Sequence, residues 1–419
     1  MICDYRRSMR HIQSLRPISL VTTGRTGSDL LQSLLDSHPE VLTFNGILQF
    51  YVEFAPISLC LASESFEVAD LFDEFVGHFI HRFNSRYDFV ERKDHLGEDR
   101  AQTLVLDTSA FRRHAVGFMS GQEPSKRNLL LAIYGAYNLC LSHDLLATRI
   151  LFHHAHRLDE LDLFLQDFPD TSVLVTTRDP RATFVSGIEN WRKFSQDHDN
   201  ERHLYVYIKR ILEDSEPCAL RSVRYAAVRL EDLLREDTMR AIADWLGVSF
   251  RPSMLESTWG GLHWYGDRLS DDSLKPVGWT PDRTNNNWRE RLGPMDRYVL
   301  NYLMYHRLNR YQYPNRPLRW WDALILPVLL FLPLSYERRF LSPGYLLGAL
   351  RQRHLHATLT RLASPWFYVR RIALFFGYYL RTTRGRSFDG PWIGSPNLPS
   401  ATQTSDRHSP PRESPSLPR

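Results

Sequence analysis

The chain has 419 residues, of which 43% are hydrophobic and 24% charged, and its formal net charge is +4 at pH 7. Such values are ordinary for a globular protein with a substantial core, and they exclude collagen-like, fibrous and wholly disordered chains. The positive charge is concentrated, because residues 335–387 contain ten arginines and one acid. A nucleic-acid-binding protein would normally be basic over a wider part of its surface, so we expect no nucleic-acid partner.

The cysteines and the N-terminal residues indicate the compartment. Cys3, Cys60, Cys140 and Cys218 are scattered, without the short paired spacings of a zinc site or the pattern of a disulfide framework. The first 15 residues carry charge, but no apolar run of the length found in a signal peptide follows them. We therefore expect a cytoplasmic protein.

Four short segments rich in aliphatic or β-branched residues are typical of buried strands. They are Ile18–Thr23, Thr103–Leu106, Ser172–Thr177 and Tyr225–Leu230. Turn residues and helical patterns lie between them. This alternation predicts an α/β fold of three layers, in which helices flank a central parallel sheet.

Composition divides the chain into four parts. An N-terminal segment, 1–16, precedes the predicted α/β domain at 17–318. A basic, aromatic-rich extension follows at 319–387, where we expect helices. The tail at 388–419 is rich in proline and serine and has little that can build a core, so we expect it to be disordered.

The sharpest motif directly follows the first predicted strand. Here Gly24-Arg25-Thr26-Gly27-Ser28 leads into an amphipathic helix. Such a turn directs backbone N–H groups and the positive end of the helix dipole at one point, which favours an anion. Arg25 adds a charge and Ser28 a hydroxyl donor, but the loop lacks the lysine of a Walker A motif. The alternative is an ordinary turn in which Ser28 or Asp29 caps the helix.

A second candidate phosphate site follows the third predicted strand. Arg178 is followed by Asp179-Pro180, a typical helix start, and Ser186 comes about two helical turns later. An arginine at a strand end and a serine on the next helix can both reach one phosphate group. The alternative is a plain helix start beside an exposed arginine.

Both motifs resemble those of the sulfotransferase family, and most closely its bacterial and carbohydrate branch. The likeness continues in Ser37-His38-Pro39-Glu40-Val41 and covers roughly residues 17–310. The resemblance implies a P-loop-like fold and 3′-phosphoadenosine 5′-phosphosulfate (PAPS) as sulfuryl donor. It also implies that residues 24–28 bind the 5′-phosphosulfate, and that Arg178 and Ser186 bind the 3′-phosphate.

The resemblance also suggests catalytic residues. Arg25 stands where other members carry lysine, and its permanent charge suits it to stabilise the leaving 5′-phosphate. For the base that accepts the proton of the acceptor hydroxyl, His156 is favoured and His154 is its rival. These histidines can equally be surface or packing residues. Glu53 also stays a candidate, because some members use a glutamate after the first helix.

Two further ligand predictions concern what the site lacks. We expect no metal ion, because the sequence shows no carboxylate cluster typical of a Mg²⁺ site, and the histidines of 153–156 are poorly spaced for zinc. Asp29 stands where many relatives carry a phosphate-binding threonine or serine. We do not count it as a ligand, because a carboxylate repels phosphate.

The C-terminal extension shows membrane-like features without a membrane-spanning segment. Its apolar run, 323–334, is short of the roughly 20 residues that cross a bilayer, and two prolines interrupt it. Two later stretches, 346–362 and 366–380, mix aromatic residues and leucine with arginine, as interfacial helices do. They can bind the inner face of a membrane, pack on the enzyme core or form a homodimer, and the pattern alone does not choose.

The predicted activity is in-line sulfuryl transfer from PAPS to a hydroxyl group, with a carbohydrate or a lipid-linked glycan as acceptor. Two other functions stay open. A phosphotransferase with a degenerate loop would need a Walker lysine and Mg²⁺-binding acids, and the sequence shows neither. A catalytically inactive nucleotide- or membrane-binding protein would keep the same fold without the chemistry.

Overall fold

The computed structural model describes residues 4–22, 24–54, 67–88, 95–156, 158–194, 200–213, 223–233, 235–266, 287–348, 355–385 and 392–393. Thr23, at the end of the first predicted strand, lies outside the described residues. So does the predicted tail at 388–419, apart from two residues.

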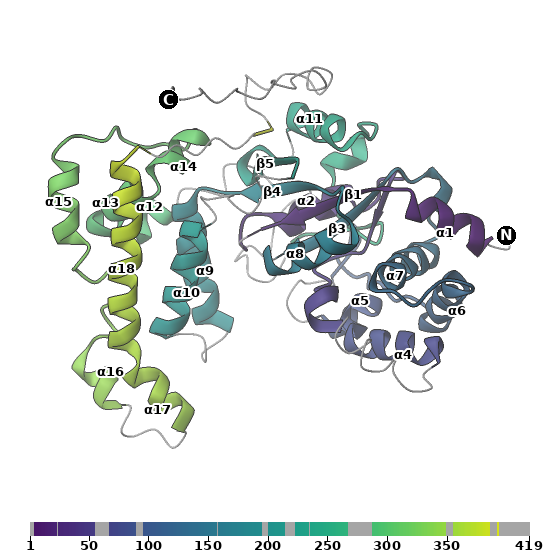
Figure 1. Ribbon diagram of the computed structural model, residues 1–419, viewed down its shortest axis with the longest axis horizontal. Coiled ribbons are helices and arrows are strands. Elements are labelled where there is room, and N and C mark those ends of the chain that lie inside the picture. The colour runs from purple at the N-terminus through teal and green to yellow at the C-terminus, as the bar shows by residue number, and fades with distance from the viewer. Residues whose placement is uncertain are drawn as a thin grey trace, which may run out of the picture.

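Five parallel strands form the central sheet. They are β1 (Arg16–Val21), β2 (Val41–Thr43), β3 (Ile150–His156), β4 (Ser172–Thr177) and β5 (Tyr225–Arg229). Their order is β2-β3-β1-β4-β5, so β1 lies in the middle, with β3 on one side and β4 on the other (Figure 1). The predicted parallel sheet is confirmed, and the carboxyl ends of β1, β3 and β4 lie side by side.

Helices cover both faces of this sheet, which confirms the three layers. On one face, α2 (Ser28–Leu35) and α11 (Glu236–Leu246) pack on Ile18 and Leu20 of β1. Side chains alternate along a strand, so Val21 points to the opposite side. The helices of that side are α1 (Tyr5–Gln13), α4 (Val68–His78), α5 (Ile80–Phe83), α6 (Thr108–Met119), α7 (Lys126–Cys140), α8 (Leu158–Asp167), α9 (Pro180–Phe194) and α10 (Glu201–Glu213).

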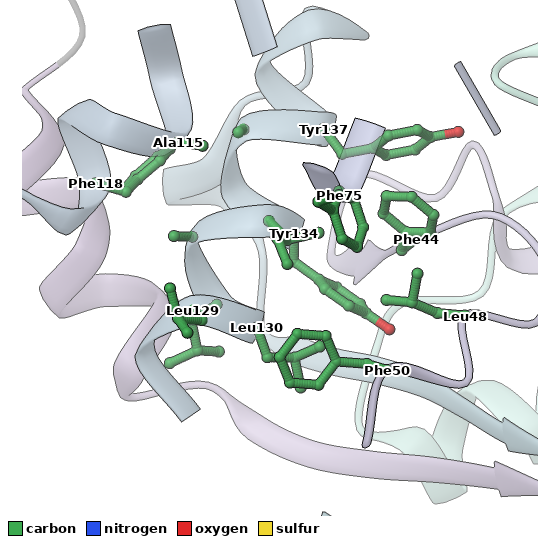
Figure 2. Close-up of a cluster of buried hydrophobic side chains, with 14 of the residues drawn as sticks. Phe44, Leu48, Phe50, Phe75, Ala115, Phe118, Leu129, Leu130, Tyr134 and Tyr137 are labelled. Carbon is green, nitrogen blue, oxygen red and sulfur yellow. The ribbon is translucent and has the colours of Figure 1, made fainter. Parts of the chain in front are cut away.

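Aromatic side chains build the largest core cluster, on the side of α7. Figure 2 shows Phe44, which follows β2, between Tyr134 and Tyr137 of α7. Its ring centroid lies 4.2 Å from that of Tyr137 and 5.9 Å from that of Tyr134. Phe75 of α4 packs edge-on against Phe44 at 6.0 Å. Large buried rings of this kind contribute strongly to stability, and here they join β2, α4 and α7.

The strand prediction was right for three segments and wrong for residues 103–106. Val105 makes only an isolated antiparallel bridge to Asn84, and its side chain is exposed. The sheet instead contains β2 and β3, which the sequence pattern missed. β2 has three residues, and the three histidines of β3 interrupt the apolar run that normally marks a buried strand.

The C-terminal extension is helical, as predicted. After α12 (Asn287–Arg291), α13 (Pro294–Leu303) and α14 (Tyr305–Arg310) it contains α15 (Asp322–Leu329), α16 (Pro343–Leu347), α17 (Leu355–Leu362) and α18 (Ser364–Thr383). One face of α18 packs on α10 and α13, and α15 lies beside it (Figure 1). The shorter elements of the described chain are η1 (Phe50–Phe54), η2 (Ser85–Tyr87), η3 (Leu145–Ala147), η6 (Leu230–Asp232), η7 (Pro252–Leu255), β6 (Thr258–Trp259) and β7 (Leu262–His263).

Two residues of the predicted tail lie against the edge of the central sheet. Trp392 forms a parallel bridge with Ala227 of β5, and the N–H of Ile393 donates to the Ala227 carbonyl at 2.8 Å. The Arg229 guanidinium lies 4.9 Å from the centre of the Trp392 ring. The sequence pattern did not predict this contact, because a strand-like pairing of two residues with an edge strand leaves little compositional signal.

A buried group of charges joins the extension to α10. Arg371 of α18 donates to both carboxylate oxygens of Glu337, at 2.8 and 2.9 Å, and to the Leu330 carbonyl at 2.6 Å. Both charged side chains are almost completely buried. Glu201, the first residue of α10, is buried beside them. Burial and the nearby Glu337 carboxylate raise the pKa of Glu201 to about 9, so Glu201 is protonated at neutral pH.

The raised pKa of Glu201 predicts that the free energy of unfolding falls as the pH rises. The pKa of Glu201 increases on folding from about 4.5 to about 9. Its contribution to stability is therefore complete below about pH 4.5 and is lost progressively up to about pH 9. Glu201→Gln cannot ionise and should reduce this pH dependence. Urea unfolding at several pH values in this window measures the effect, and identical pH dependence in the two proteins would contradict it.

Candidate anion-binding and catalytic site

The loop after β1 is bent by three residues with positive φ. The φ angle is 90° at Gly24, 60° at Arg25 and 89° at Gly27. Glycine adopts this backbone readily, whereas an arginine does so at an energetic cost. A β-carbon at Gly27 would lie 2.4 Å from Leu230 Cδ1, and the positive φ strains any residue with a side chain, so this position favours glycine. A β-carbon at Gly24 would meet no atom within 4 Å, which shows open space on that side of the loop.

Buried hydroxyl groups hold the loop in place. Thr26 is fully buried and hydrogen-bonds Thr22, and its Oγ1 lies 2.9 Å from Oγ1 of Thr176 on β4. Thr22 Oγ1 also accepts from the N–H of Gly24 at 3.0 Å. The Thr26 side chain therefore supports the loop, and only its backbone is suited to a ligand.

The start of α2 favours the anion-site interpretation over the capped turn. The cap residue is Gly27, which has no side chain that could bind the amides of the first turn. Ser28 is already the first residue of the helix, and it is buried. The amides of the first turn and the positive end of the helix dipole thus lie at the loop. Neither Ser28 nor Asp29 is the cap.

Three predicted phosphate-binding side chains meet at the ends of β1 and β4. Arg25 Nε donates to Oγ of Ser186 on α9 at 3.4 Å. Arg178 Nη1 donates to the Arg25 carbonyl at 3.5 Å. All three residues are half-buried. Two guanidinium groups, a hydroxyl and a helix start at adjacent strand ends can hold anionic groups, as is typical of this edge of an α/β sheet.

The electrostatics of Arg178 also suit an anionic ligand. Burial lowers its pKa, and Arg25 lowers it further, while Glu231 opposes the change. Glu231 accepts hydrogen bonds from the N–H of Asp179 and from Tyr313 Oη, both at 3.1 Å, and burial raises its pKa. Two neighbouring half-buried cations attract an anion that can lie between them.

Arg181, the second arginine of the helix-start motif, is structural. Asp179 Oδ1 accepts from the N–H of Arg181 at 3.0 Å, which confirms the predicted helix cap. The Arg181 guanidinium binds Asp179 Oδ2 at 2.6 Å and the Pro314 carbonyl at 2.8 Å. It also lies 4.2 Å from the centre of the Trp288 ring. The arginine is buried and also donates to Asn301 Oδ1 at 2.8 Å, so it fixes the start of α9 against α13 and the chain after α14.

Alternation along β3 separates its histidines. His153 lies on the side of α7 and α8, where its Nδ1 is 2.8 Å from Tyr134 Oη and its ring stacks on Phe164 at 4.4 Å. Burial lowers the pKa of His153 to about 3, so it stays neutral. His154 and His156 lie on the opposite face, where their ring centroids are 5.5 Å apart. Only these two, the predicted bases, can face the loop.

Gln32 of α2 orients His154. Its Nε2 donates to Thr43 Oγ1 at 3.2 Å and to the Phe44 carbonyl at 2.7 Å, which turns Oε1 toward His154 Nδ1 at 3.1 Å. Because an amide oxygen can only accept, His154 Nδ1 is the donor in this contact. Asp29 Oδ1 lies 3.8 Å from the same nitrogen, so this carboxylate is beside an imidazole.

His156 ends β3 in a strained conformation. Its φ is 55°, and the pairing of β1 with β3 shifts here, so that Val21 lies opposite His156 and skips Ala155. Bulges and positive φ angles at residues other than glycine are costly and concentrate at functional sites. His156 is half-buried, whereas His154 is fully buried. An acceptor can therefore reach His156 more easily.

Glu53 lies on η1, which precedes α4 in the chain. It accepts from Gln49 Nε2 at 2.6 Å and pairs with His78 Nε2 at 3.4 Å, and its carboxylate is exposed. These contacts join η1 to α4, so they do not link Glu53 to the loop after β1. The structure thus gives no support to Glu53 as the base.

Sequence reasoning missed two residues of the site, Gln32 and Glu231. Gln32 had a signal, since it is a polar residue among the leucines of an amphipathic helix. Glu231 had none that was local, because only the pairing of β4 with β5 brings it to Arg178. Among the described residues there is no group of three or more side chains that could hold a metal ion.

A sequence model described as the sulfotransferase family matches residues 17–252. Among solved structures, the chain is similar to the sulfotransferase domain of the olefin synthase from Synechococcus PCC 7002, with 18% identity and a TM-score of 0.38; the match covers 67% of this chain and 90% of that one. The sulfotransferase domain from the curacin biosynthetic pathway is 16% identical, with a TM-score of 0.35 and coverage of 66% and 90%.

The sulfotransferase STF9 from Mycobacterium avium is 16% identical, with a TM-score of 0.30, and the match covers 60% of this chain and 69% of that one. Among curated proteins, none matches the chain.

Proposed function

Since the chain belongs to the sulfotransferase family, we propose that it transfers a sulfuryl group from PAPS to a hydroxyl group of a carbohydrate or lipid-linked glycan. The observation that best supports the proposal is the meeting of Arg25, Arg178 and Ser186 at neighbouring strand ends. We further propose that the reaction takes place in the cytoplasm, at the inner face of the membrane.

The residues present fit a nucleotide that carries anionic groups on both sides of its ribose. The amides at Gly27 and Ser28, together with Arg25, would hold the 5′-phosphosulfate, and Arg178 and Ser186 would hold the 3′-phosphate. The open space at Gly24 leaves room beside the loop. When bound, PAPS supplies a sulfuryl group joined to a good leaving group, the 5′-phosphate.

Different residues of the chain would then have different roles in the transfer. Arg25 stabilises the negative charge that develops on the bridging oxygen as its bond to sulfur breaks. His156 accepts the proton of the acceptor hydroxyl while the oxygen of that hydroxyl bonds to sulfur. Because the transition state of such transfers is loose, holding donor and acceptor in line contributes most of the catalysis.

The proposal predicts that the protein moves radioactive sulfate from [³⁵S]PAPS to glycans or glycolipids from its source cells. Transfer should continue in the presence of EDTA. In His156→Gln it should fall by about 10²–10⁴-fold, the usual contribution of a general base, with donor binding unchanged. The matched control is the exposed His78→Gln, which should transfer label as the wild type does. His153→Gln is unsuitable as a control, because His153 is fully buried and its replacement would disturb the core.

Two outcomes distinguish the alternatives. If the wild type binds donor but labels no acceptor in total extracts, the protein is an inactive nucleotide-binding member of the family. If His156→Gln transfers label as fast as the wild type, another residue is the base, and His154→Gln becomes the next variant to measure.

A further inference from the structure

The C-terminal helices expose an apolar surface. The outward face of α18 carries Trp366, Val369, Ala373, Phe376 and Leu380, spaced by three or four residues. Trp366 is 63% exposed. This spacing places the five side chains along one stripe of the helix. The opposite face of α18 is the one that packs on α10 and α13.

Helix α15 extends this surface. It lies beside α18, because Tyr379 Oη donates to the Ala323 carbonyl at 2.8 Å and Tyr368 Oη donates to the Phe331 carbonyl at 2.5 Å. Its exposed side chains, with those around its ends, are Trp320, Trp321, Leu324, Ile325, Val328, Phe331 and Leu332. Of the 19 exposed large hydrophobic residues in the described chain, 14 lie between 320 and 380. Such concentration marks an interaction surface.

The charges of this region favour a negatively charged partner. Residues 319–385 contain two acids, Asp322 and Glu337, and both are completely buried. Arginines are exposed or half-buried over the same elements; they are Arg319, Arg338, Arg339, Arg361, Arg370, Arg381 and Arg384. The surface thus combines tryptophan, phenylalanine and aliphatic side chains with arginine and shows no described carboxylate. This combination complements a bilayer with anionic headgroups.

We propose that α15 and α18 dock the protein on an anionic phospholipid bilayer, with their apolar side chains in the interface and their arginines at the headgroups. No described helix is both long and apolar enough to cross a membrane, so the helices would lie along its surface. A second copy is a poorer partner, because two arginine-bearing surfaces without exposed carboxylates would face each other. The proposal does not rest on sulfuryl transfer.

Sedimentation of the full chain with lipid vesicles tests the proposal. We expect binding to vesicles of phosphatidylcholine and phosphatidylglycerol, weaker binding to phosphatidylcholine alone, and loss of binding as salt screens the headgroups. The variant Trp366→Ser/Val369→Ser should bind the anionic vesicles about tenfold or more weakly, because the affinity depends on the apolar area that is buried in the bilayer interface. Val105→Ser/Leu146→Ser is the matched control, since it removes two exposed apolar residues far from the extension in sequence.

Circular dichroism and thermal unfolding show whether each variant keeps the fold of the wild type, whether or not the protein binds a nucleotide. Equal binding to neutral and anionic vesicles, or undiminished binding by Trp366→Ser/Val369→Ser, would overturn the proposal. So would a wild-type dimer that this variant converts to monomer in ultracentrifugation, with no vesicle binding, because a second copy would then cover the surface. A protein that binds vesicles but transfers no label would contradict the proposed function alone.

Discussion

Arg25→Ala is expected to lower kcat for sulfuryl transfer by about 10²–10³-fold, the usual effect of removing one preorganised group at a developing negative charge. Arg25 lies on the strained loop between Gly24 and Gly27, with its Nε 3.4 Å from Ser186 Oγ. Because an arginine stays charged at every accessible pH, the loss should be the same across the pH range. Initial rates with [³⁵S]PAPS at saturating acceptor measure it.

Two further variants separate charge from geometry at this position. Arg25→Lys keeps the positive charge and should retain more activity than Arg25→Ala, although it loses the planar contact with Ser186. Ser186→Ala removes that contact and keeps the charge. If Arg25→Ala loses less than about fivefold, far below the effect of such a group elsewhere, Arg25 does not stabilise the leaving phosphate.

Arg371→Met is expected to lower the free energy of unfolding by about 3–5 kcal/mol, because it leaves the buried Glu337 without its cation. The two side chains are 1% and 0% exposed, and they share two hydrogen bonds. The variant also leaves the Leu330 carbonyl without its guanidinium donor. Urea unfolding, followed by circular dichroism, measures the change.

An exposed ion pair provides the matched control for this experiment. Arg112 and Asp73 form a pair at 2.9 Å in which both side chains are about half exposed, so Arg112→Met should cost less than about 1 kcal/mol. The double variant Arg371→Met/Glu337→Gln should recover part of the lost stability, since no buried charge remains unpaired. An equal, small cost for Arg371→Met and Arg112→Met would show that the buried pair does not hold the extension.

Local sequence was sufficient to predict the loop after β1 and the helix start after β4. Gly24 and Gly27 permit the positive φ angles of the loop, and Asp179-Pro180 favours a helix start, so local residue preferences determine both backbone conformations. The sequence could not show that Arg25 meets Ser186, which lies 161 positions later, because only the pairing of β1 with β4 joins them.

The base was harder to predict from the sequence. His153, His154 and His156 are nearly adjacent, and their different environments follow only from the alternation of β3, a strand that the pattern missed. The strained φ of His156 and its register shift come from tertiary packing, which leaves no local mark. The apolar pattern of the extension was visible, but which face of α18 stays exposed depends on its contact with α10.

The proposed function depends on two guanidinium groups at adjacent strand ends, which would bind a nucleotide with phosphates at both ends of its ribose. Calorimetric titration with adenosine 3′,5′-bisphosphate measures this binding. We expect one molecule to bind per chain, and Arg178→Gln to weaken the affinity by about tenfold or more, since a charge-assisted contact to phosphate is lost. The exposed Arg112→Gln should bind as the wild type does. Absence of binding to the wild type, or undiminished affinity in Arg178→Gln, would show that these groups do not form a donor site.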